Sequence, residues 1–393
     1  MRRAAAVVIA MLGFAIAGCS DDSVSSSSAA PTSVSTVATT VAADTTVAAT
    51  TTSTVADTVA PTTEAPTTTE ALPVNNWQAV TAPTDCMCAN GSSYTYWIHQ
   101  GDPTKVVFYL QGGGACFDPG TCAFDSGTYK VTAPATEDPS GISTGIFDFT
   151  DARNPIRDYS VVYAPYCTGD LHLGTATHVY GPQLTVQHKG FVNASTALND
   201  LVAHFPDAKQ VLVTGESAGS APTPLYGGLA HDLLPNAEIE VLADSSGAYP
   251  NVPAVTAFIG QLWGTEGARP AWPEVQGDNP DWSLNGLYIQ ANKHAPDILF
   301  ARHDYAFDAV QTTFAKLAGL PSENLVSLID ANTAIIEQGG VDLHSYVAPG
   351  TTHTVLSRPD FYTETVEGVP FVDWVSDLVK RQPGPDVHCT TCQ

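Results

Sequence analysis

The stretch that most constrains the fold of this chain is VLVTGESAG at residues 211–219. An apolar run with the composition of a buried strand leads directly into Gly215-Glu-Ser-Ala-Gly219, and a helix-like segment follows. In a strand-to-helix turn this tight, only glycines fit beside the serine, and the turn lifts the hydroxyl above the sheet. The amide N–H of the next residue then faces a developing oxyanion. The pattern predicts that Ser217 is the nucleophile of a serine hydrolase, with an ordinary Gly/Ser-rich turn as the alternative.

Residues 1–18 have the features of a secretory signal. Two arginines follow Met1, and a short apolar run extends over residues 4–17, too short to span a bilayer comfortably. The segment ends in Ile16-Ala-Gly-Cys19, which is typical of a bacterial lipobox. We therefore predict a lipoprotein, cleaved before Cys19 and anchored by lipid on this thiol to the outer face of a bacterial membrane. Ordinary secretion with an incidental cysteine is the alternative.

Residues 19–75 predict a disordered stalk. Thr, Ser, Ala, Val and Pro dominate, and neither a basic nor an aromatic residue occurs. Such a segment cannot bury enough apolar surface to offset its ordering entropy. Its Ser/Thr-rich composition is also typical of O-glycosylated stalks. Residues 76–393 are then long enough for one large catalytic domain, which we expect to be a monomer.

The charge of the domain excludes one class of partner. Residues 1–75 hold six of the 40 acidic residues and two of the 15 basic ones, so the domain carries a formal charge near −21. A nucleic-acid partner is therefore not expected. The same field disfavours a polyanionic substrate, unless Lys105, Lys130 or Lys189 form a local basic groove.

The cysteine content fits an exported protein. Besides Cys19, the chain has Cys86, Cys88, Cys116, Cys122, Cys167, Cys389 and Cys392. The closely spaced pairs at the two ends could form a zinc site, but export and their wide separation favour disulfides. Seven is an odd number, so one thiol is expected to be free or paired between chains.

The order of elements predicts an α/β fold. Strands are expected over 94–99, 105–110, 160–166, 211–214, 238–243, 298–301 and 343–347. Helices are expected over 191–205, from the nucleophile turn to 234, and over 308–318, 323–337 and 370–375. Alternation of this kind implies a mostly parallel, doubly wound sheet flanked by helices.

Two further parts of a hydrolase site can be sought at the ends of these strands. The glycine run in Gln111-Gly-Gly-Gly-Ala-Cys116 follows a strand, where α/β-hydrolases place half of the oxyanion hole. In this fold the acid and then the histidine follow the serine in sequence. The histidines after Ser217 are His294, His303, His344, His353 and His388. Of these, His353 lies in a loop after the last clear strand, whereas His344 lies inside that strand.

The acid has three candidates. Asp244 follows the strand next to that of the nucleophile, where a turn residue is the alternative role. Asp304 and Asp308 follow the next strand, and a helix N-cap is the alternative role for Asp308. The sequence pattern alone leaves the choice open.

The domain resembles the pectin acetylesterase/Notum family of α/β-hydrolases. The matching motifs occur in order from Cys88 to His353, nearly the whole domain. They are Cys88-Ala-Asn-Gly-Ser92, Leu110-Gln-Gly-Gly-Gly-Ala-Cys116, Pro165-Tyr-Cys-Thr-Gly-Asp170, Gly215-Glu-Ser-Ala-Gly219, Leu242-Ala-Asp-Ser-Ser-Gly247, Phe307-Asp-Ala-Val-Gln311 and Ser345-Tyr-Val-Ala-Pro-Gly-Thr-Thr-His353.

This resemblance implies a specific site. The acid is Asp308, the base is His353, and the oxyanion donors are the amides of Gly113, Gly114 and Ala218. The chain departs from the family in lacking a tryptophan at position 114 or 115, in having glutamine at 111 and in having Glu216 beside the nucleophile.

The resemblance also bears on the disulfides. A Cys116–Cys122 bond would pin the short loop beside the glycine run. The resemblance and the need to tie down the termini imply Cys88–Cys167 and a bond from Cys86 to Cys389 or Cys392.

The function expected from these residues is that of a serine esterase. It would remove a short acyl group, acetyl in particular, from an O-acylated carbohydrate or similar small ester, with neutral esters favoured over polyanions. No metal or organic cofactor is expected. The alternatives are a Notum-like deacylase that removes lipid from a protein and an inactive hydrolase-fold binding module.

Overall fold

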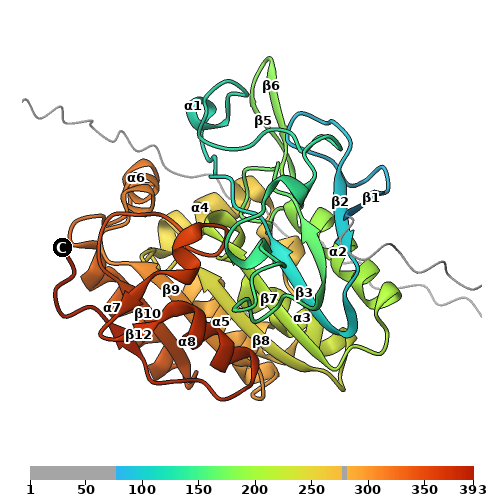
Figure 1. Cartoon of the computed structure of the whole chain (residues 1–393). Helices are drawn as coiled ribbons and strands as arrows, with labels where there is room; N and C mark the ends of the chain where they lie inside the picture. Colours follow the sequence, from blue (N-terminus) through green and yellow to red (C-terminus); the bar gives the residue numbers. More distant parts are fainter. Residues whose placement is uncertain (1–76, 277–280) are drawn as a thin grey trace, which may run out of the picture. The chain divides into compact units, whose positions relative to one another are not determined.

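The structure is a computed structural model that describes residues 77–276 and 281–393. These residues belong to one compact unit, Thr68–Gln393, built around a nine-stranded sheet (Figure 1). The expected signal segment, lipidated Cys19 and stalk lie outside the described residues. None of the described helices is long and apolar enough to cross a membrane.

The large sheet is mostly parallel, as expected. Its spatial order is β1-β2-β4-β3-β7-β8-β9-β10-β13; only the β1–β2 and β2–β4 pairs are antiparallel, and the remaining pairs are parallel. The strands are β1 (Trp77–Thr81), β2 (Thr95–His99), β3 (Asp102–Leu110), β4 (Tyr159–Ala164), β7 (Gln210–Glu216), β8 (Glu238–Asp244), β9 (Leu299–Tyr305), β10 (Leu343–Ala348) and β13 (Val387–His388). Two small hairpins pair β5 (Thr177–Gly181) with β6 (Leu184–Gln187) and β11 (Thr365–Val366) with β12 (Val369–Pro370).

Helices connect these strands. The α-helices are α1 (Pro119–Cys122), α2 (Gly190–His204), α3 (Thr223–Leu233), α4 (Pro253–Trp263), α5 (Leu284–His294), α6 (Ala309–Leu317), α7 (Leu325–Gln338) and α8 (Phe371–Val379). The 3-10 helices are η1 (Pro139–Gly141), η2 (Gly145–Phe147), η3 (Ser217–Gly219), η4 (Thr265–Ala268), η5 (Pro273–Val275) and η6 (Pro359–Tyr362).

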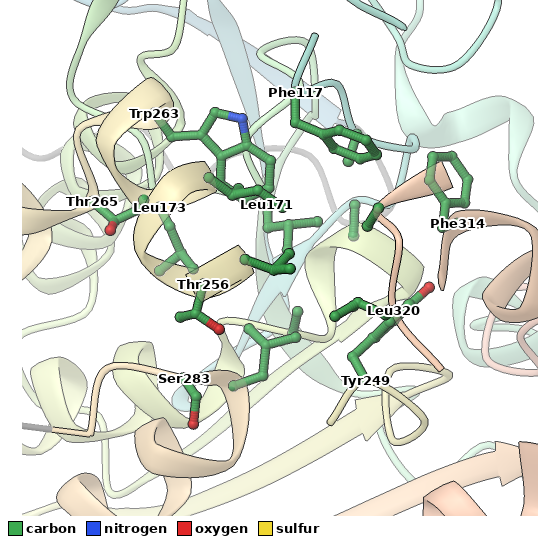
Figure 2. A pocket seen from close by; sticks show the side chains of 18 of the residues that line it. Phe117, Leu171, Leu173, Tyr249, Thr256, Trp263, Thr265, Ser283, Phe314 and Leu320 are labelled. Carbon is green, nitrogen blue, oxygen red and sulfur yellow. The ribbon is translucent and has the colours of Figure 1, made fainter. Parts of the chain in front are cut away.

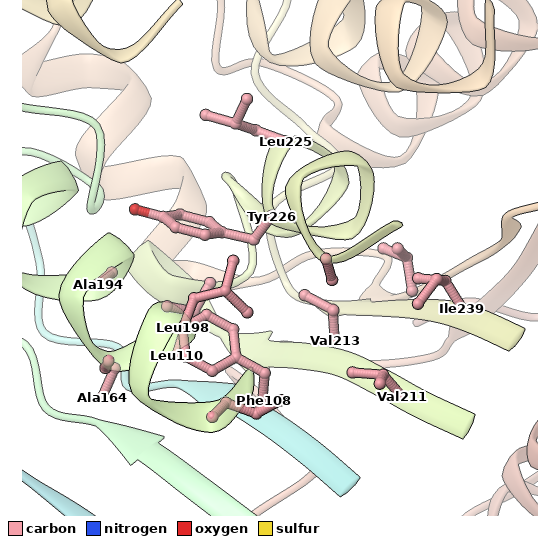
Figure 3. Close-up of a cluster of buried hydrophobic side chains, with 14 of the residues drawn as sticks. Phe108, Leu110, Ala164, Ala194, Leu198, Val211, Val213, Leu225, Tyr226 and Ile239 are labelled. Atoms are coloured by element: carbon pink, nitrogen blue, oxygen red, sulfur yellow. The ribbon is translucent and has the colours of Figure 1, made fainter. Parts of the chain in front are cut away.

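Alternation along the central strands divides the core into two layers. In β3, Phe108 packs in the same cluster as α2, α3 and α5, whereas Val107 and Tyr109 pack on the side of α8. Successive strand side chains point to opposite faces, so both faces are apolar only when the strand is buried on both. Figure 3 shows the first layer, where Leu198 of α2 and Tyr226 of α3 lie over the strand residues Phe108 and Val213. Helices on both faces confirm the doubly wound architecture.

The structure corrects the boundaries of two predicted strands. The fourth strand ends at Ala164 rather than at Tyr166, and the strand predicted over 298–301 continues to Tyr305. Arg302, His303 and Asp304 are buried within it, so Asp304 does not follow a strand end. Three consecutive polar residues are not expected inside a buried strand, so the sequence pattern ended the strand too early. In the structure each of the three has a buried partner. Helices α4 and α5 lie in a region, 248–297, for which no elements are predicted.

The disulfides fall partly as expected. Cys116 bonds to Cys122 and Cys88 bonds to Cys167. The expected link from Cys86 to the C-terminus is wrong, because Cys389 bonds to Cys392 and Cys86 is a free, buried thiol. Cys86 instead contacts the hydroxyl of Thr196 on α2, at 3.2 Å. Bonds of this kind fit folding in an oxidising compartment.

Candidate active site

The turn after β7 places Ser217 in a strained conformation. Its φ is +53°, in the left-handed region that side chains other than glycine rarely adopt. The flanking glycines are required by space. A Cβ on Gly219 would lie 2.0 Å from the carbonyl oxygen of Leu110, and one on Gly215 would lie 2.6 Å from that same oxygen. The turn therefore packs directly against the end of β3 and presents the serine above the sheet.

The glycine run after β3 lies against this turn. A Cβ on Gly112 would sit 2.9 Å from Cβ of Ser217, and Gly114 has a φ of +80°. The carbonyl of Gly113 accepts a hydrogen bond from the amide of Lys130, which fixes the loop. Among the described residues, no acceptor is bonded to the amides of Gly113 and Gly114. Ala218 is the second residue of η3, where amides have no partner within the helix. These three amides are thus available to an oxyanion.

Asp308 and His353 are brought together from distant parts of the chain. Nδ1 of His353 lies 2.6 Å from Oδ2 of Asp308, whose side chain is fully buried. The other carboxylate oxygen of Asp308 caps α6 by accepting the amides of Val310 and Gln311 at 2.8 and 2.9 Å. Nε2 of His353 has no hydrogen-bond partner among the described residues. Both roles considered for Asp308, helix cap and orienting acid, are therefore compatible.

Asp244 and His303 form a second pair, in a different setting. Nδ1 of His303 lies 2.9 Å from Oδ1 of Asp244, and its Nε2 lies 2.9 Å from Glu364. Burial alone would lower the pKa of His303, but the two carboxylates outweigh it and raise the pKa to about 10. Burial would likewise raise the pKa of Asp244, yet hydrogen bonds from His303 and from the amides of Leu356 and Val355 lower it. This histidine is held as an imidazolium ion.

The second pair supports the loop that carries His353. The Oδ2 atom of Asp244 accepts the amides of Val355 and Leu356 at 2.7 and 2.9 Å. Ser357, in the same loop, donates a hydrogen bond to Glu216 at 2.7 Å. Glu216 directly precedes Ser217, so the histidine loop is fastened to the nucleophile turn. Burial raises the pKa of Glu216, the bond from Ser357 lowers it, and the Asp244 carboxylate raises it further.

The other candidates from the sequence lie elsewhere. Asp304 is buried and binds Arg302 and the amide of Gly247. His344 is in β10, and His388 of β13 contacts Asp330. His294 ends α5, beside Asp232. The sequence offered no signal for Ser357 or Glu364, because both lie in irregular segments where a lone polar residue is common.

A cavity of about 150 Å³ opens beside the nucleophile turn, with Ser217, Ala218 and Gly114 in its wall. Most of its lining is apolar and comes from α4, from α6 and from the loops around residues 117 and 171 (Figure 2). In Figure 2, Trp263, Leu171, Phe117, Phe314 and Leu320 surround the space. Such a wall suits an apolar group bound next to the serine.

The parallel sheet with helices on both faces, together with the strand–serine–helix turn, defines an α/β-hydrolase fold. The structure of the Wnt deacylase Notum from Drosophila shares this fold, with a TM-score of 0.58 and 16% identity over 79% of this chain and 95% of that one.

Sequence comparisons find similarity to the same family that the motifs resemble. The model described as Pectinacetylesterase matches residues 69–262, which include the glycine run and Ser217. Palmitoleoyl-protein carboxylesterase NOTUM of Schmidtea mediterranea is 28% identical over 147 residues, or 35% of this chain. The match spans only 27% of that relative's length. These comparisons support a relation to the pectin acetylesterase/Notum family, and this similarity favours ester hydrolysis as the class of activity.

Proposed function

We propose that this protein is a serine carboxylic-ester hydrolase with Ser217 as nucleophile, His353 as base and Asp308 as the orienting acid. The observation that carries the proposal is the hydrogen-bonding state of His353. Its Nδ1 is bound at 2.6 Å to a buried carboxylate, while its Nε2 has no partner among the described residues. An imidazole held in this way has one nitrogen available to accept a proton.

We propose the following reaction for these residues. Ser217 Oγ attacks the ester carbonyl as His353 Nε2 takes its proton, and the imidazolium formed is stabilised by Asp308. The amides of Gly113, Gly114 and Ala218 hold the oxyanion of the tetrahedral intermediate, each contributing on the order of 3 kcal/mol. His353 returns the proton to the leaving alcohol. Water then repeats the sequence on the acyl-enzyme, releasing the carboxylic acid.

The first test separates this site from an inactive binding module. Ser217→Ala should abolish turnover of a p-nitrophenyl ester and labelling by a fluorophosphonate probe, with an unchanged Tm. Alanine keeps the Cβ and therefore the same backbone strain, and only the hydroxyl is lost, so this variant should fold as the wild type does. Labelling that persists in Ser217→Ala, or a wild-type protein that is not labelled, would remove the proposal.

The size of the acyl group is a separate question. The sequence favours acetyl on an O-acylated carbohydrate, with a Notum-like deacylase as the alternative. A cavity of about 150 Å³ with mostly apolar walls is large enough to hold benzene, and so roughly six carbons. An acetyl group would leave most of that volume unfilled. We therefore propose that the acyl chain is longer than acetyl, which favours the deacylase alternative.

A chain-length series of p-nitrophenyl esters tests this choice, with kcat/KM expected to rise from acetate to about hexanoate. Val255 on α4 lines the cavity, whereas Ala257 on the same helix is exposed and does not. Val255→Trp should therefore lower the hexanoate rate relative to the acetate rate, and the control Ala257→Trp should leave the ratio unchanged. A wild-type maximum at acetate would instead restore the acetylesterase.

The location of the protein is proposed from the N-terminal sequence. We propose export as a lipoprotein with lipid on Cys19, a stalk over residues 19–75 and a catalytic domain over 76–393. Metabolic labelling with a fatty-acid analogue should mark the wild type and not Cys19→Ser.

A further inference from the structure

A cluster of histidines and carboxylates lies at the C-terminal ends of α3 and α5. His231 and Asp232 are in the last turn of α3, and His294 is the last residue of α5. One ligand atom from each of these three residues can be chosen so that all three lie within 4.8 Å of one another. Glu274 of η5 and Asp297, in the turn before β9, complete the group.

We propose that this α3–α5 cluster binds one divalent transition-metal ion, with Zn²⁺ as the best match. Its ligands would be Nδ1 of His231, Nε2 of His294 and a carboxylate oxygen of Asp232, with water completing the coordination. Imidazole nitrogen and carboxylate oxygen in a four-coordinate arrangement are typical of zinc. Bond lengths near 2.1 Å put the ligand atoms of a tetrahedral ion about 3.4 Å apart. The His294 Nε2–Asp232 Oδ1 contact, now 2.6 Å, would therefore open slightly on binding.

In each histidine, the ring nitrogen that would not bind the ion lies near a carboxylate that is not itself a proposed ligand. Nδ1 of His294 lies 3.5 Å from Glu274, and Nε2 of His231 lies 3.4 Å from Asp297. Neither contact is a hydrogen bond here, and this Glu274 oxygen has no hydrogen-bond partner among the described residues. In metal sites, the second N–H of a histidine is typically donated to a carboxylate placed on that side of the ring. Nδ1 of His231 is buried and has no hydrogen-bond partner among the described residues. An unsatisfied buried nitrogen is costly, and a metal ion would satisfy it.

A tryptophan holds the proposed ligands in place. The indole N–H of Trp272 donates to Oδ2 of Asp232 at 2.6 Å, and its ring stacks on His294 at 4.4 Å between centroids. Trp272 is buried and packs against Gly228 of α3, where a Cβ would lie 2.2 Å from the indole ring. The orientation of two ligands is therefore fixed by packing before any ion arrives.

The electrostatics of the cluster favour a cation. Asp232, Glu274 and Asp297 surround the two imidazoles, and the C-terminal ends of α3 and α5 add partial negative charge. One exposed basic residue, Lys293, lies in the same last turn of α5. In the absence of metal, the N–H at Nε2 of His294 can donate a hydrogen bond to Oδ1 of Asp232, 2.6 Å away. The ion would replace that proton.

The cluster lies far from the proposed catalytic residues. Helix α3 begins just after the nucleophile turn and ends before β8, so its C-terminal end is at the opposite edge of the parallel sheet. The metal would therefore be structural, tying the C-terminal end of α3 to that of α5. Ester hydrolysis should proceed without it.

Metal titration of the chelator-treated protein tests the proposal. The wild type should bind one Co²⁺ with the visible absorption of a tetrahedral ion, and Zn²⁺ should displace it. At a hundredfold excess over Kd, Zn²⁺ should raise Tm by about 5 °C. Esterase activity per folded molecule should not change.

Two variants and a control locate the site. His231→Gln and Asp232→Asn should each weaken Co²⁺ binding at least tenfold and remove the Tm shift. His204→Gln is the control. His204 pairs with Asp200 on α2, and this ion pair contains no second histidine. A wild type that shows neither Co²⁺ absorption nor a Tm shift would overturn the proposal. Binding that survives in both cluster variants would also overturn it.

Discussion

Two aspartate–histidine pairs lie at the carboxyl edge of the same sheet and serve different purposes. In the Asp308–His353 pair, one imidazole nitrogen is bound and the other is open. In the Asp244–His303 pair, Glu364 occupies the second nitrogen, and the histidine is fully buried. The open pair can accept a proton from a substrate group. The enclosed pair cannot, because its imidazole already carries both protons and both are engaged.

The contrast shows that the role of an aspartate–histidine pair depends on whether a third group, here Glu364, contacts the second imidazole nitrogen. A second carboxylate converts a histidine from a base into a fixed cation, and that cation then stabilises the Asp244 carboxylate that holds the His353 loop. The enclosed pair is thus a support for the open one. The following predictions test this division of roles.

The largest effect is expected from Asp308→Asn. Oδ1 can still cap α6, since asparagine is as good a cap as aspartate. The amide nitrogen, however, would face Nδ1 of His353 and favour the wrong tautomer, so turnover should fall by about 10⁴. Steady-state rates and thermal unfolding, measured together, should show lost activity with little change in Tm. A loss smaller than that of Asp244→Asn would reverse the two assignments.

Asp244→Asn should act mainly on stability. The Asp244 carboxylate accepts from His303 with one oxygen and from the backbone amides of Val355 and Leu356 with the other. Asparagine has only one side-chain oxygen, so one of these two sets of donors would lose its acceptor. Breaking a buried pair in this way costs about 3–5 kcal/mol. Turnover of the folded fraction should fall far less than in Asp308→Asn. Urea unfolding monitored by fluorescence gives the stability, and an unchanged midpoint would show that the pair is not a support.

The enclosed pair should also give stability a pH dependence. The pKa of His303 is raised from 6.5 to about 10 in the folded protein. Its contribution is therefore fully present below pH 6.5 and is lost as the pH rises toward 10. Urea midpoints of the wild type should decline over this interval. His303→Gln should be less stable at pH 6 and should show a flatter profile, so equal slopes in both proteins would contradict the assignment.

Much of the open pair follows from sequence, because its parts stand at the ends of recognisable elements. Ser217 lies in a compact local motif, and His353 follows the last clear strand. The pattern left three candidates for the acid, and only the resemblance to the family selected Asp308. The enclosed pair shows why the rest does not follow. His303 lies inside a strand whose polar residues resemble a loop, and its partner Glu364 becomes adjacent only through tertiary packing.

The cysteines and the acyl cavity also show that local features can be predicted from sequence, whereas features that depend on tertiary packing cannot. Cys116 and Cys122 are six residues apart, and such a loop can be judged locally. The linkage of Cys86 to the C-terminus depended on where β13 lies, and the chain pairs Cys389 with Cys392 instead. Helix α4, which forms one wall of the cavity, contains no charged residue to mark an exposed face. Its apolar side chains became interpretable only once their position beside Ser217 was known.

The smallest predicted effect concerns substrate charge, which should act at the open pair alone, because only that pair is proposed to meet substrate. Lys105, Lys130 and Lys189 each contact different residues. Lys130 contacts Gln111 and Glu137, Lys189 binds the carbonyl of Thr175, and Lys105 lies over the ring of Tyr159.

A domain of formal charge near −21 then repels polyanions over a screening length of about 8 Å at physiological salt. The same acyl group should be released several-fold faster from a neutral glycan than from de-methylated pectin, with the difference shrinking as salt is added. Lys130→Gln should widen the gap slightly if this lysine contributes any attraction, whereas Lys105→Gln should not, because Lys105 is at the start of β3, away from the nucleophile turn. Equal or faster release from the polyanion at low salt would show that the local field at Ser217 differs in sign from that of the domain.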